Sequence, residues 1–235
     1  MTVMLSLTAR MRLARLMLVV NPHADDADWP DRIAELVAAG VDFVYLTTPR
    51  AGVEAVAYGL DRLANSVAGS GALIAMNREL AAHQPGDADC IITGSSTGLA
   101  DEALGHRWTL YGQRVHDRHQ LSAAARNARV SLLTVGPTFL PRDAATAAPG
   151  TRLLRNAAER LPDPAAGPAW FAVGGINERN LDQVFDAGAY RIAVASAILN
   201  SRSPERAAAR LRERLDELWS SRAELTNLPL KVVGH

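Results

Sequence analysis

Short apolar runs rich in Val, Ile and Leu alternate along this chain with segments whose apolar residues recur at helical spacing. The stretch 170–199 is the clearest example. The run W-F-A-V stops at Gly174 and Gly175, a segment of helical periodicity follows, and the run R-I-A-V-A stops near Ser196. This pattern predicts a strand, a helix and a second strand. Its repetition along the chain predicts βα units that form a parallel sheet.

We expect eight such units. The predicted strands cover 16–21, 41–46, 73–76, 90–93, 108–115, 130–135, 170–173 and 191–195. The predicted helices cover 29–39, 53–66, 78–83, 99–104, 117–127, 151–161, 178–187 and 204–225. The first strand ends in N-P-H rather than in a G-x-G-x-x-G fingerprint, which favours a barrel over an open doubly wound sheet. The prediction is an α/β fold with a single (β/α)8 TIM barrel.

The barrel is expected to form one domain over 1–235, in which 1–11 fray as an N-terminal extension and 137–150 form a lid-like loop. Arginines interrupt the apolar positions of the opening segment, and no apolar run reaches the roughly 20 residues of a membrane span. We therefore expect a cytoplasmic protein with no membrane partner.

Composition excludes several kinds of chemistry. The chain has 25 basic and 25 acidic residues, so no overall charge attracts nucleic acid. Lys231 in the tail is the only lysine, which argues against a Schiff-base mechanism. Cys90 is the only cysteine and lies in an apolar run, so we expect a buried structural thiol. The six histidines show no metal-binding spacing, and no metal site is predicted.

The functional site of such a barrel lies at the C-terminal ends of its strands. Gly174 and Gly175 end the seventh strand and Ser196 follows the eighth, where barrels commonly bind a phosphate through main-chain N–H groups. This arrangement predicts a phosphate site. The alternative is that the two glycines only terminate a strand.

His116 ends the fifth strand, two residues after Arg114, in G-Q-R-V-H-D. A histidine at this place can shuttle a proton near neutral pH. The alternative is that it belongs only to the cap of the next helix, together with Asp117. Other polar or small residues that follow strands are candidates for substrate contact and include Asn77, Arg78 and Gly136.

The chain resembles the thiamine-phosphate synthase and TenI family of (β/α)8 barrels between residues 112 and 211. G-Q-R-V-H is similar to the family's G-x-S-x-H, and V-G-P-T-F is similar to its G-P-x-F; A-V-G-G-I-N and V-A-S-A-I complete the match. The resemblance implies that a thiazole phosphate binds at Gly174, Gly175, Ala195 and Ser196. It also implies that chains associate as homo-oligomers.

The synthase of this family joins the thiazole phosphate to hydroxymethylpyrimidine diphosphate with the help of Mg2+. Its Q-x-R-x-K motif falls here on Tyr45, Thr47 and Pro49. Its N-D-R motif falls on residues 77–79, and its second metal aspartate falls on Thr97. The pyrophosphate-binding residues are therefore largely replaced.

The TenI branch tautomerises a thiazole carboxylate phosphate by proton transfer and needs no metal. The resemblance implies that His116 is its proton shuttle and that arginines such as Arg78, Arg114 and Arg142 hold the carboxylate. We therefore predict a TenI-like tautomerase without a cofactor. The alternatives are a diverged synthase that uses Mg2+ and a non-catalytic relative that binds the same ligand.

Overall fold

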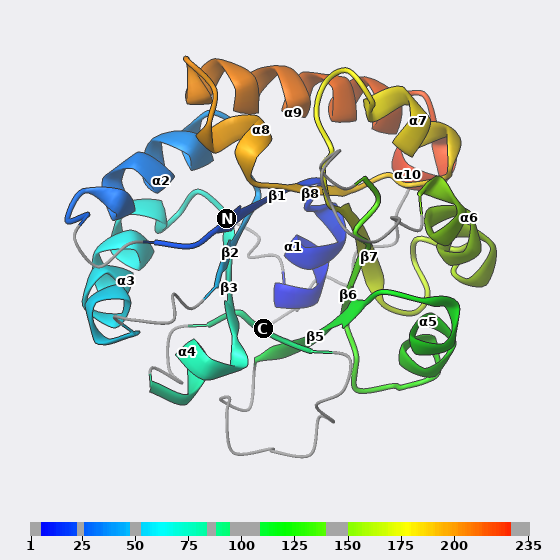
Figure 1. The fold of residues 1–235 in the computed structure, drawn as a ribbon, viewed down its shortest axis with the longest axis horizontal. Helices are drawn as coiled ribbons and strands as arrows, with labels where there is room; N and C mark the ends of the chain where they lie inside the picture. The colour runs from blue at the N-terminus through cyan, green and yellow to red at the C-terminus, as the bar shows by residue number, and fades with distance from the viewer. Residues whose placement is uncertain are drawn as a thin grey trace, which may run out of the picture.

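A computed structural model of the chain describes residues 6–22, 26–47, 53–83, 88–94, 109–139 and 150–226. Eight parallel strands close into a barrel in the order β1 to β8, and helices surround it (Figure 1). The strands are Leu16–Val20, Phe43–Leu46, Leu73–Asn77, Cys90–Thr93, Leu110–Val115, Leu132–Val135, Ala169–Val173 and Ile192–Val194. The predicted single (β/α)8 TIM barrel is confirmed.

The helices that lie among the described residues occupy the expected places between strands, with three additions. They are α1 Leu7–Leu13, α2 Trp29–Ala38, α3 Val53–Val67, α4 Arg78–His83, α5 Arg118–Ala125, α6 Thr151–Arg160, α7 Leu181–Asp186, α8 Ser196–Leu199, α9 Pro204–Ser220 and α10 Ala223–Thr226. The additions are α1, α8 and α10. The predicted helix over 99–104 and most of the predicted lid-like loop lie outside the described residues.

Most of the strands are largely apolar on both faces because one face lines the barrel and the other meets the helices, and β5, with Gln113 and Arg114, is the exception. Phe43 and Phe171 point inward and pack edge to face, with ring centroids 5.9 Å apart. Cys90 is completely buried in the same interior cluster, as predicted. The outward faces pack against the helices in a second, larger cluster. This double burial explains why the strands appear in the sequence as continuous apolar runs.

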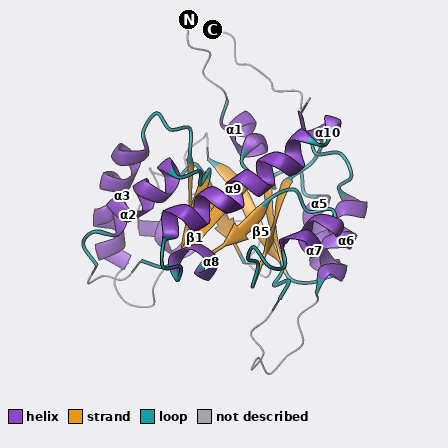
Figure 2. Ribbon diagram, turned by 90° about the horizontal axis from the view of Figure 1, so that it is seen from above, coloured by secondary structure: helices purple, strands orange, loops and turns teal. Residues whose placement is uncertain are grey.

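Helix α1 closes the N-terminal end of the barrel, opposite α8 (Figure 2). Met11 is only 1% exposed and packs against the interior cluster that contains Met17 and Phe43. The Ser6 hydroxyl caps the helix by accepting a bond from the N–H of Ala9 at 3.2 Å. The prediction that 1–11 fray as an extension is therefore wrong for residues 7–11, because their apolar side chains complete the core.

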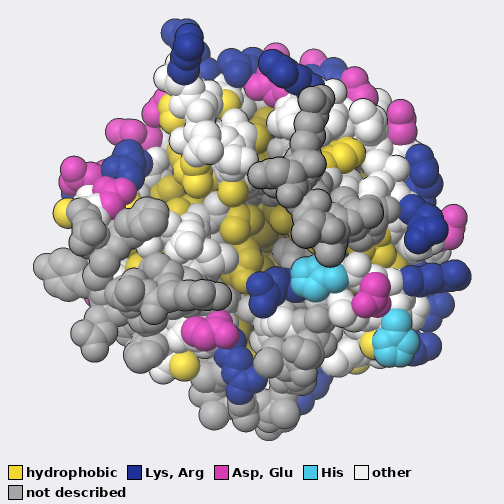
Figure 3. All heavy atoms as spheres, in the orientation of Figure 1, with side chains coloured by type: hydrophobic (Ala, Val, Ile, Leu, Met, Phe, Trp, Pro, Cys, Tyr) yellow, Lys and Arg dark blue, Asp and Glu magenta, His cyan; other side chains and the backbone are white. Residues whose placement is uncertain are grey.

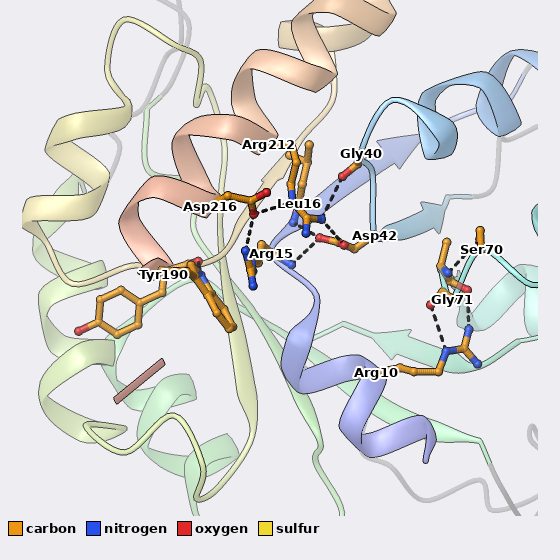
Figure 4. Close-up of polar contacts among 12 residues, drawn as sticks. Arg10, Arg15, Leu16, Gly40, Asp42, Ser70, Gly71, Tyr190, Arg212 and Asp216 are labelled. Atoms are coloured by element: carbon orange, nitrogen blue, oxygen red, sulfur yellow. Dashed lines mark hydrogen bonds and ion pairs between the residues drawn. The ribbon is translucent and has the colours of Figure 1, made fainter. Parts of the chain in front are cut away.

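A group of charged side chains ties the same end of the barrel to α9 (Figure 4). The Asp42 carboxylate accepts bonds from the main-chain N–H groups of Arg15 at 2.7 Å and Leu16 at 3.0 Å, and it pairs with Arg212. The Arg212 Nε also donates to Asp216 at 2.7 Å. These contacts join the starts of β1 and β2 to the last long helix. They lie at the end of the barrel that usually serves stability.

Two local departures from the predicted elements have identifiable causes. Helix α7 begins at Leu181 rather than at 178, because Asn177 and Asn180 form a turn in which the N–H of Asn177 donates to Asn180 Oδ1 at 2.9 Å. The predicted last helix ends earlier than expected, at Ser220 in α9, and the added short helix α10 follows from Ala223. Among the described residues, no helix is both long and apolar enough to cross a membrane.

Candidate active site

The C-terminal ends of the strands form the mouth of the barrel, and two levels of inward-facing side chains form its floor. The strand register and the tilt of an eight-stranded barrel put side chains of alternate strands at one level. The lower level contains Tyr45, Ile92, Thr134 and Ala193, and the upper level contains Val19, Asn77, Arg114 and Val173. Figure 3 views this face and shows an apolar hollow bordered by Lys or Arg and His side chains.

The glycine pair after β7 is required by the packing of the chain that follows β6. Gly174 and Gly175 have φ of +100° and +62°, which side chains rarely tolerate. A Cβ on Gly174 would lie 2.6 Å from the Cα of Pro137, and a Cβ on Gly175 would lie 2.6 Å from the main-chain oxygen of Phe139. The two glycines thus have a packing role whether or not a ligand binds.

The residues of the predicted phosphate site come together at the adjoining ends of β7 and β8, where Val173 pairs with Ala193. Gly175, Ala195 and Ser196 are exposed. No described residue accepts a hydrogen bond from the N–H of Gly175 or of Ser196. The arrangement therefore presents main-chain donors at the mouth. Whether they bind a phosphate stays a prediction.

A groove of 420 Å³ adjoins this place, between the start of α7 and helices α8 and α9. It is lined by Ser196 together with Asn177, Arg179 and Asn200. Arg179 was not among the predicted site residues. In the sequence, Arg179 is marked only by its position two residues after Asn177, beyond the end of β7. A solvent-exposed turn would show the same pattern.

The imidazole of His116 is held by the chain that follows the neighbouring strand. Its Nδ1 lies 2.6 Å from the main-chain oxygen of Gly136. A carbonyl oxygen can only accept, so Nδ1 carries a proton, and in the neutral imidazole the lone pair is then on Nε2. The helix cap is supplied by Asp117, whose carboxylate accepts from the N–H of Gln120 at 2.8 Å. His116 is exposed, with Nε2 available for a proton transfer.

Gly136 was predicted to contact substrate, and the structure gives it another role. A Cβ at this position would lie 2.1 Å from the main-chain oxygen of Val173, so only glycine fits between the two strands. Its carbonyl orients His116. Gly136 thus lies beside the predicted proton shuttle.

Tyr45 on β2 and Arg114 on β5 both face the barrel interior near its mouth. Tyr45 is only 4% exposed, and its hydroxyl has no hydrogen-bond partner among the described residues. Burial raises the pKa of Tyr45 to about 12, and the positive charge of Arg114 opposes this rise. Arg114 is exposed, and its guanidinium makes no hydrogen bond or ion pair with the described part of the chain. The site thus contains a buried neutral donor and an accessible cation.

Asn77 and Arg78 lie at the end of β3, both half-buried. The Asn77 Oδ1 accepts a bond from the N–H of Leu80 at 3.2 Å and so supports the start of α4. The strand register places Asn77 on the same level as Arg114, and Arg78 follows as the first residue of α4. Arg142, the remaining predicted contact, lies outside the described residues.

Within the described ranges, no three His, Cys, Asp or Glu side chains lie close enough together to hold a metal ion. Magnesium is usually held in proteins by one or two carboxylates together with substrate oxygens and water. Glu79 is the acidic residue that follows β3, and it is exposed. The described residues do not fit a preformed magnesium site, and the predicted absence of a metal stays a prediction.

The fold and this mouth define a (β/α)8-barrel protein with a candidate small-molecule site at the C-terminal ends of its strands. The chain belongs to the thiamine monophosphate synthase family, whose model matches residues 16–198.

Among known proteins, thiamine-phosphate synthase of Mycobacterium ulcerans is 34% identical over 219 residues, which cover 88% of this chain and 97% of that protein. Thiamine-phosphate synthase of Acidothermus cellulolyticus is 32% identical over 206 residues, covering 86% of this chain and 95% of that protein. Among solved structures, thiamine phosphate pyrophosphorylase from Pyrococcus furiosus is similar, with a TM-score of 0.72 and 21% identity. The match covers 89% of this chain and 98% of the Pyrococcus furiosus chain. The predicted family is confirmed.

Proposed function

We propose that this protein joins hydroxymethylpyrimidine diphosphate to a thiazole phosphate and so makes thiamine phosphate. Relatives named thiamine-phosphate synthase, 32% and 34% identical over most of the chain, support this reaction. From the sequence, this reaction was an alternative to the predicted tautomerisation. The structural observation that carries the proposal is the pair of main-chain donors, Gly175 and Ser196, that lie unpaired at the ends of β7 and β8.

In this reaction the ring nitrogen of the thiazole attacks the methylene carbon of the pyrimidine. A C–N bond forms, the C–O bond to the diphosphate breaks, and pyrophosphate leaves with the bonding electrons. The N–H groups of Gly175 and Ser196 bind the thiazole phosphate. Negative charge that develops on the leaving group requires positive charge nearby. Arg114 supplies it from the end of β5, and no step is assigned to a metal.

The geometry of His116 favours a second candidate, the tautomerisation of a thiazole carboxylate phosphate. With Nδ1 donating to Gly136, Nε2 can take a proton from one position of the ring and return it to another. The double bonds of the ring shift between the two positions, and no group is lost. A base held in one orientation by a neighbouring strand is what this reaction needs.

The proposed reaction is tested by incubating the full chain with both substrates in a magnesium-containing buffer. We expect thiamine phosphate and pyrophosphate to appear in equal amounts. No product at an enzyme concentration equal to that of the substrates would contradict the synthase. Exchange of a thiazole ring proton with deuterated water, without synthesis, would support the tautomerase instead. Tight binding of the thiazole phosphate without either reaction would indicate the non-catalytic alternative.

A further inference from the structure

Two side-chain amides hold the turn between β7 and α7 by binding its main chain. The Nδ2 of Asn180 donates to the main-chain oxygen of Gly175 at 2.9 Å, and the Nδ2 of Asn177 donates to the same oxygen at 3.2 Å. The main-chain N–H of Asn177 donates to the Oδ1 of Asn180 at 2.9 Å. Both polar atoms of the Asn180 side chain are therefore bonded within the turn.

The side chain of Asn180 is not used to cap the helix that it precedes. Asn180 is the N-cap residue of α7, a position where an asparagine commonly accepts a hydrogen bond from the first turn of the helix. Its side chain makes no such bond to α7. It is bonded instead to the loop that ends β7, at Gly175. A role confined to starting the helix does not account for this orientation.

The preceding peptide unit is held by the chain that follows β6. The main-chain oxygen of Gly174 accepts a bond from the N–H of Phe139 at 3.0 Å. In a planar trans peptide the N–H points opposite to the carbonyl. The bond from Phe139 therefore sets the direction of the Gly175 N–H, and the amide bonds to the Gly175 oxygen set the direction of the Ile176 N–H.

These two consecutive N–H groups have no acceptor in the described part of the chain. Gly175 is exposed beside Ser196, whereas Ile176 is only 3% exposed. A buried main-chain donor without an acceptor is costly, and a ligand oxygen would remove that cost. Consecutive main-chain N–H groups of this kind form concavities that bind anions. Their directions thus matter for binding at this loop.

We infer that Asn180 is a positioning residue, whose amide holds the peptide between Gly175 and Ile176 so that the N–H groups of the loop meet the substrate phosphate. The inference rests on the proposed function and adds to it a residue that acts through the main chain. The described residues that line the groove beside Ser196 include Asn177 but not Asn180. The effect of Asn180 on the phosphate is therefore indirect.

The test is the substitution Asn180→Ala, with Asn127→Ala as the matched control. Asn127 also binds main chain, since its Oδ1 accepts a bond from the N–H of Arg129 at 3.1 Å, but its exposed turn lies between α5 and β6. Calorimetric titration would use the thiazole phosphate and the same thiazole without its phosphate. Loss of aligned bonds to a charged group predicts that Asn180→Ala lowers affinity for the thiazole phosphate about tenfold.

Affinity for the thiazole without its phosphate should stay unchanged in Asn180→Ala, and Asn127→Ala should bind both ligands as the unsubstituted protein does. In steady-state assays with both substrates, Asn180→Ala should raise KM for the thiazole phosphate about tenfold and leave kcat at saturation nearly unchanged. This division separates positioning of the phosphate loop from general damage to the fold, which would lower kcat as well.

A second variant, Asn180→Asp, isolates the bond to the Gly175 carbonyl. An aspartate keeps an acceptor for the N–H of Asn177 but has no N–H to donate, and its negative charge opposes a phosphate. We expect Asn180→Asp to bind the thiazole phosphate at least as weakly as Asn180→Ala. Retention of full affinity by either variant would overturn the inference.

Thermal unfolding completes the comparison. A fall in the Tm of Asn180→Ala together with an equal loss of affinity for both ligands would indicate a purely structural role and contradict the inference. Failure of the unsubstituted protein to bind the thiazole phosphate would also overturn it. Binding requires no turnover, so absence of thiamine phosphate with the expected binding pattern intact would contradict the proposed function alone.

Discussion

The Nδ1 of His116 lies 2.6 Å from the main-chain oxygen of Gly136, so the chain after β6 fixes the orientation of a side chain at the end of β5. Gly136 has to be glycine because a Cβ there would meet the main-chain oxygen of Val173 at 2.1 Å. Three consecutive strands, β5 to β7, thus determine where one imidazole points. Because Nδ1 donates to Gly136, the lone pair of the neutral His116 ring is on Nε2.

We expect His116→Asn to lower the rate of proton exchange at the thiazole ring by about 10²- to 10⁴-fold, the usual contribution of a general base. Binding of the thiazole phosphate should change little, because His116 is not one of the proposed phosphate donors. The measurement is NMR-detected exchange in deuterated water, with His119→Asn on exposed α5 as the control. Equal exchange rates for His116→Asn and the unsubstituted protein would exclude the role.

Gly174→Ala should destabilise the protein more than Gly69→Ala. Both glycines have positive φ, +100° and +82°, so each substitution adds backbone strain of about 1–2 kcal/mol. Only at Gly174 would the new Cβ also meet main-chain atoms, with Pro137 Cα at 2.6 Å, which adds about 1–3 kcal/mol. Nothing lies within 4 Å at Gly69. Urea unfolding of the two variants measures the difference, and equal losses would argue against close packing after β6.

The ion pair between Asp42 and Arg212 should stabilise the fold measurably. Their side chains are 22% and 26% exposed, so water screens them less than a surface pair. A double-mutant cycle with Asp42→Ala and Arg212→Met should give a coupling free energy of about 1 kcal/mol or more. The pair Asp182–Arg214 is the control, because its side chains are 77% and 49% exposed. Its coupling free energy should be about 0.5 kcal/mol or less. Similar coupling free energies for the two pairs would contradict the expectation that Asp42–Arg212 stabilises the N-terminal end of the barrel more than an exposed pair does.

Asp89 should make the protein less stable as the pH rises from acid to neutral. Burial raises the pKa of its carboxyl above the ordinary 3.8, against the opposing effects of the Ile74 N–H and Arg10. The folded state therefore holds this proton more tightly than the unfolded state. The resulting stability is fully present below pH 3.8 and is lost as the pH passes through the raised pKa of the folded state.

The substitution Asp89→Asn keeps an acceptor for the Ile74 N–H and removes the ionisation. Relative to the unsubstituted protein, we expect Asp89→Asn to gain stability between acid and neutral pH. Urea unfolding at several pH values measures the gain. Asp61→Asn on the exposed face of α3 serves as the control. A gain that did not depend on pH would contradict this account of Asp89.

The barrel was predictable because its strands are buried on both faces and therefore leave a local signal in the sequence. Runs such as those at β2 and β4 are buried throughout, and the strand boundaries agree with the predicted ones to within two residues. The positions of His116 and of the Gly174–Gly175 pair followed from the ends of strands. Their roles in binding and proton transfer remain predictions.

The features that were missed depend on contacts between distant residues. Helix α1 is held in place because Met11 joins the buried cluster that contains Met17 and Phe43, and no local pattern reports this packing. The start of α7 depends on one hydrogen bond between Asn177 and Asn180. The hydroxyl of Tyr45 has no hydrogen-bond partner among the described residues, which only the folded barrel shows. Sequence periodicity contains none of this information.

The complete burial of Cys90 has a practical use. Its thiol lies inside the barrel, and burial raises its pKa far above the usual range, so the reactive thiolate is hardly populated. The chain has no other cysteine. A cysteine introduced by Asn200→Cys, at the exposed edge of the groove beside Ser196, would be the one thiol open to a fluorophore or spin label. Ligand entry could then be followed spectroscopically without first removing the native cysteine.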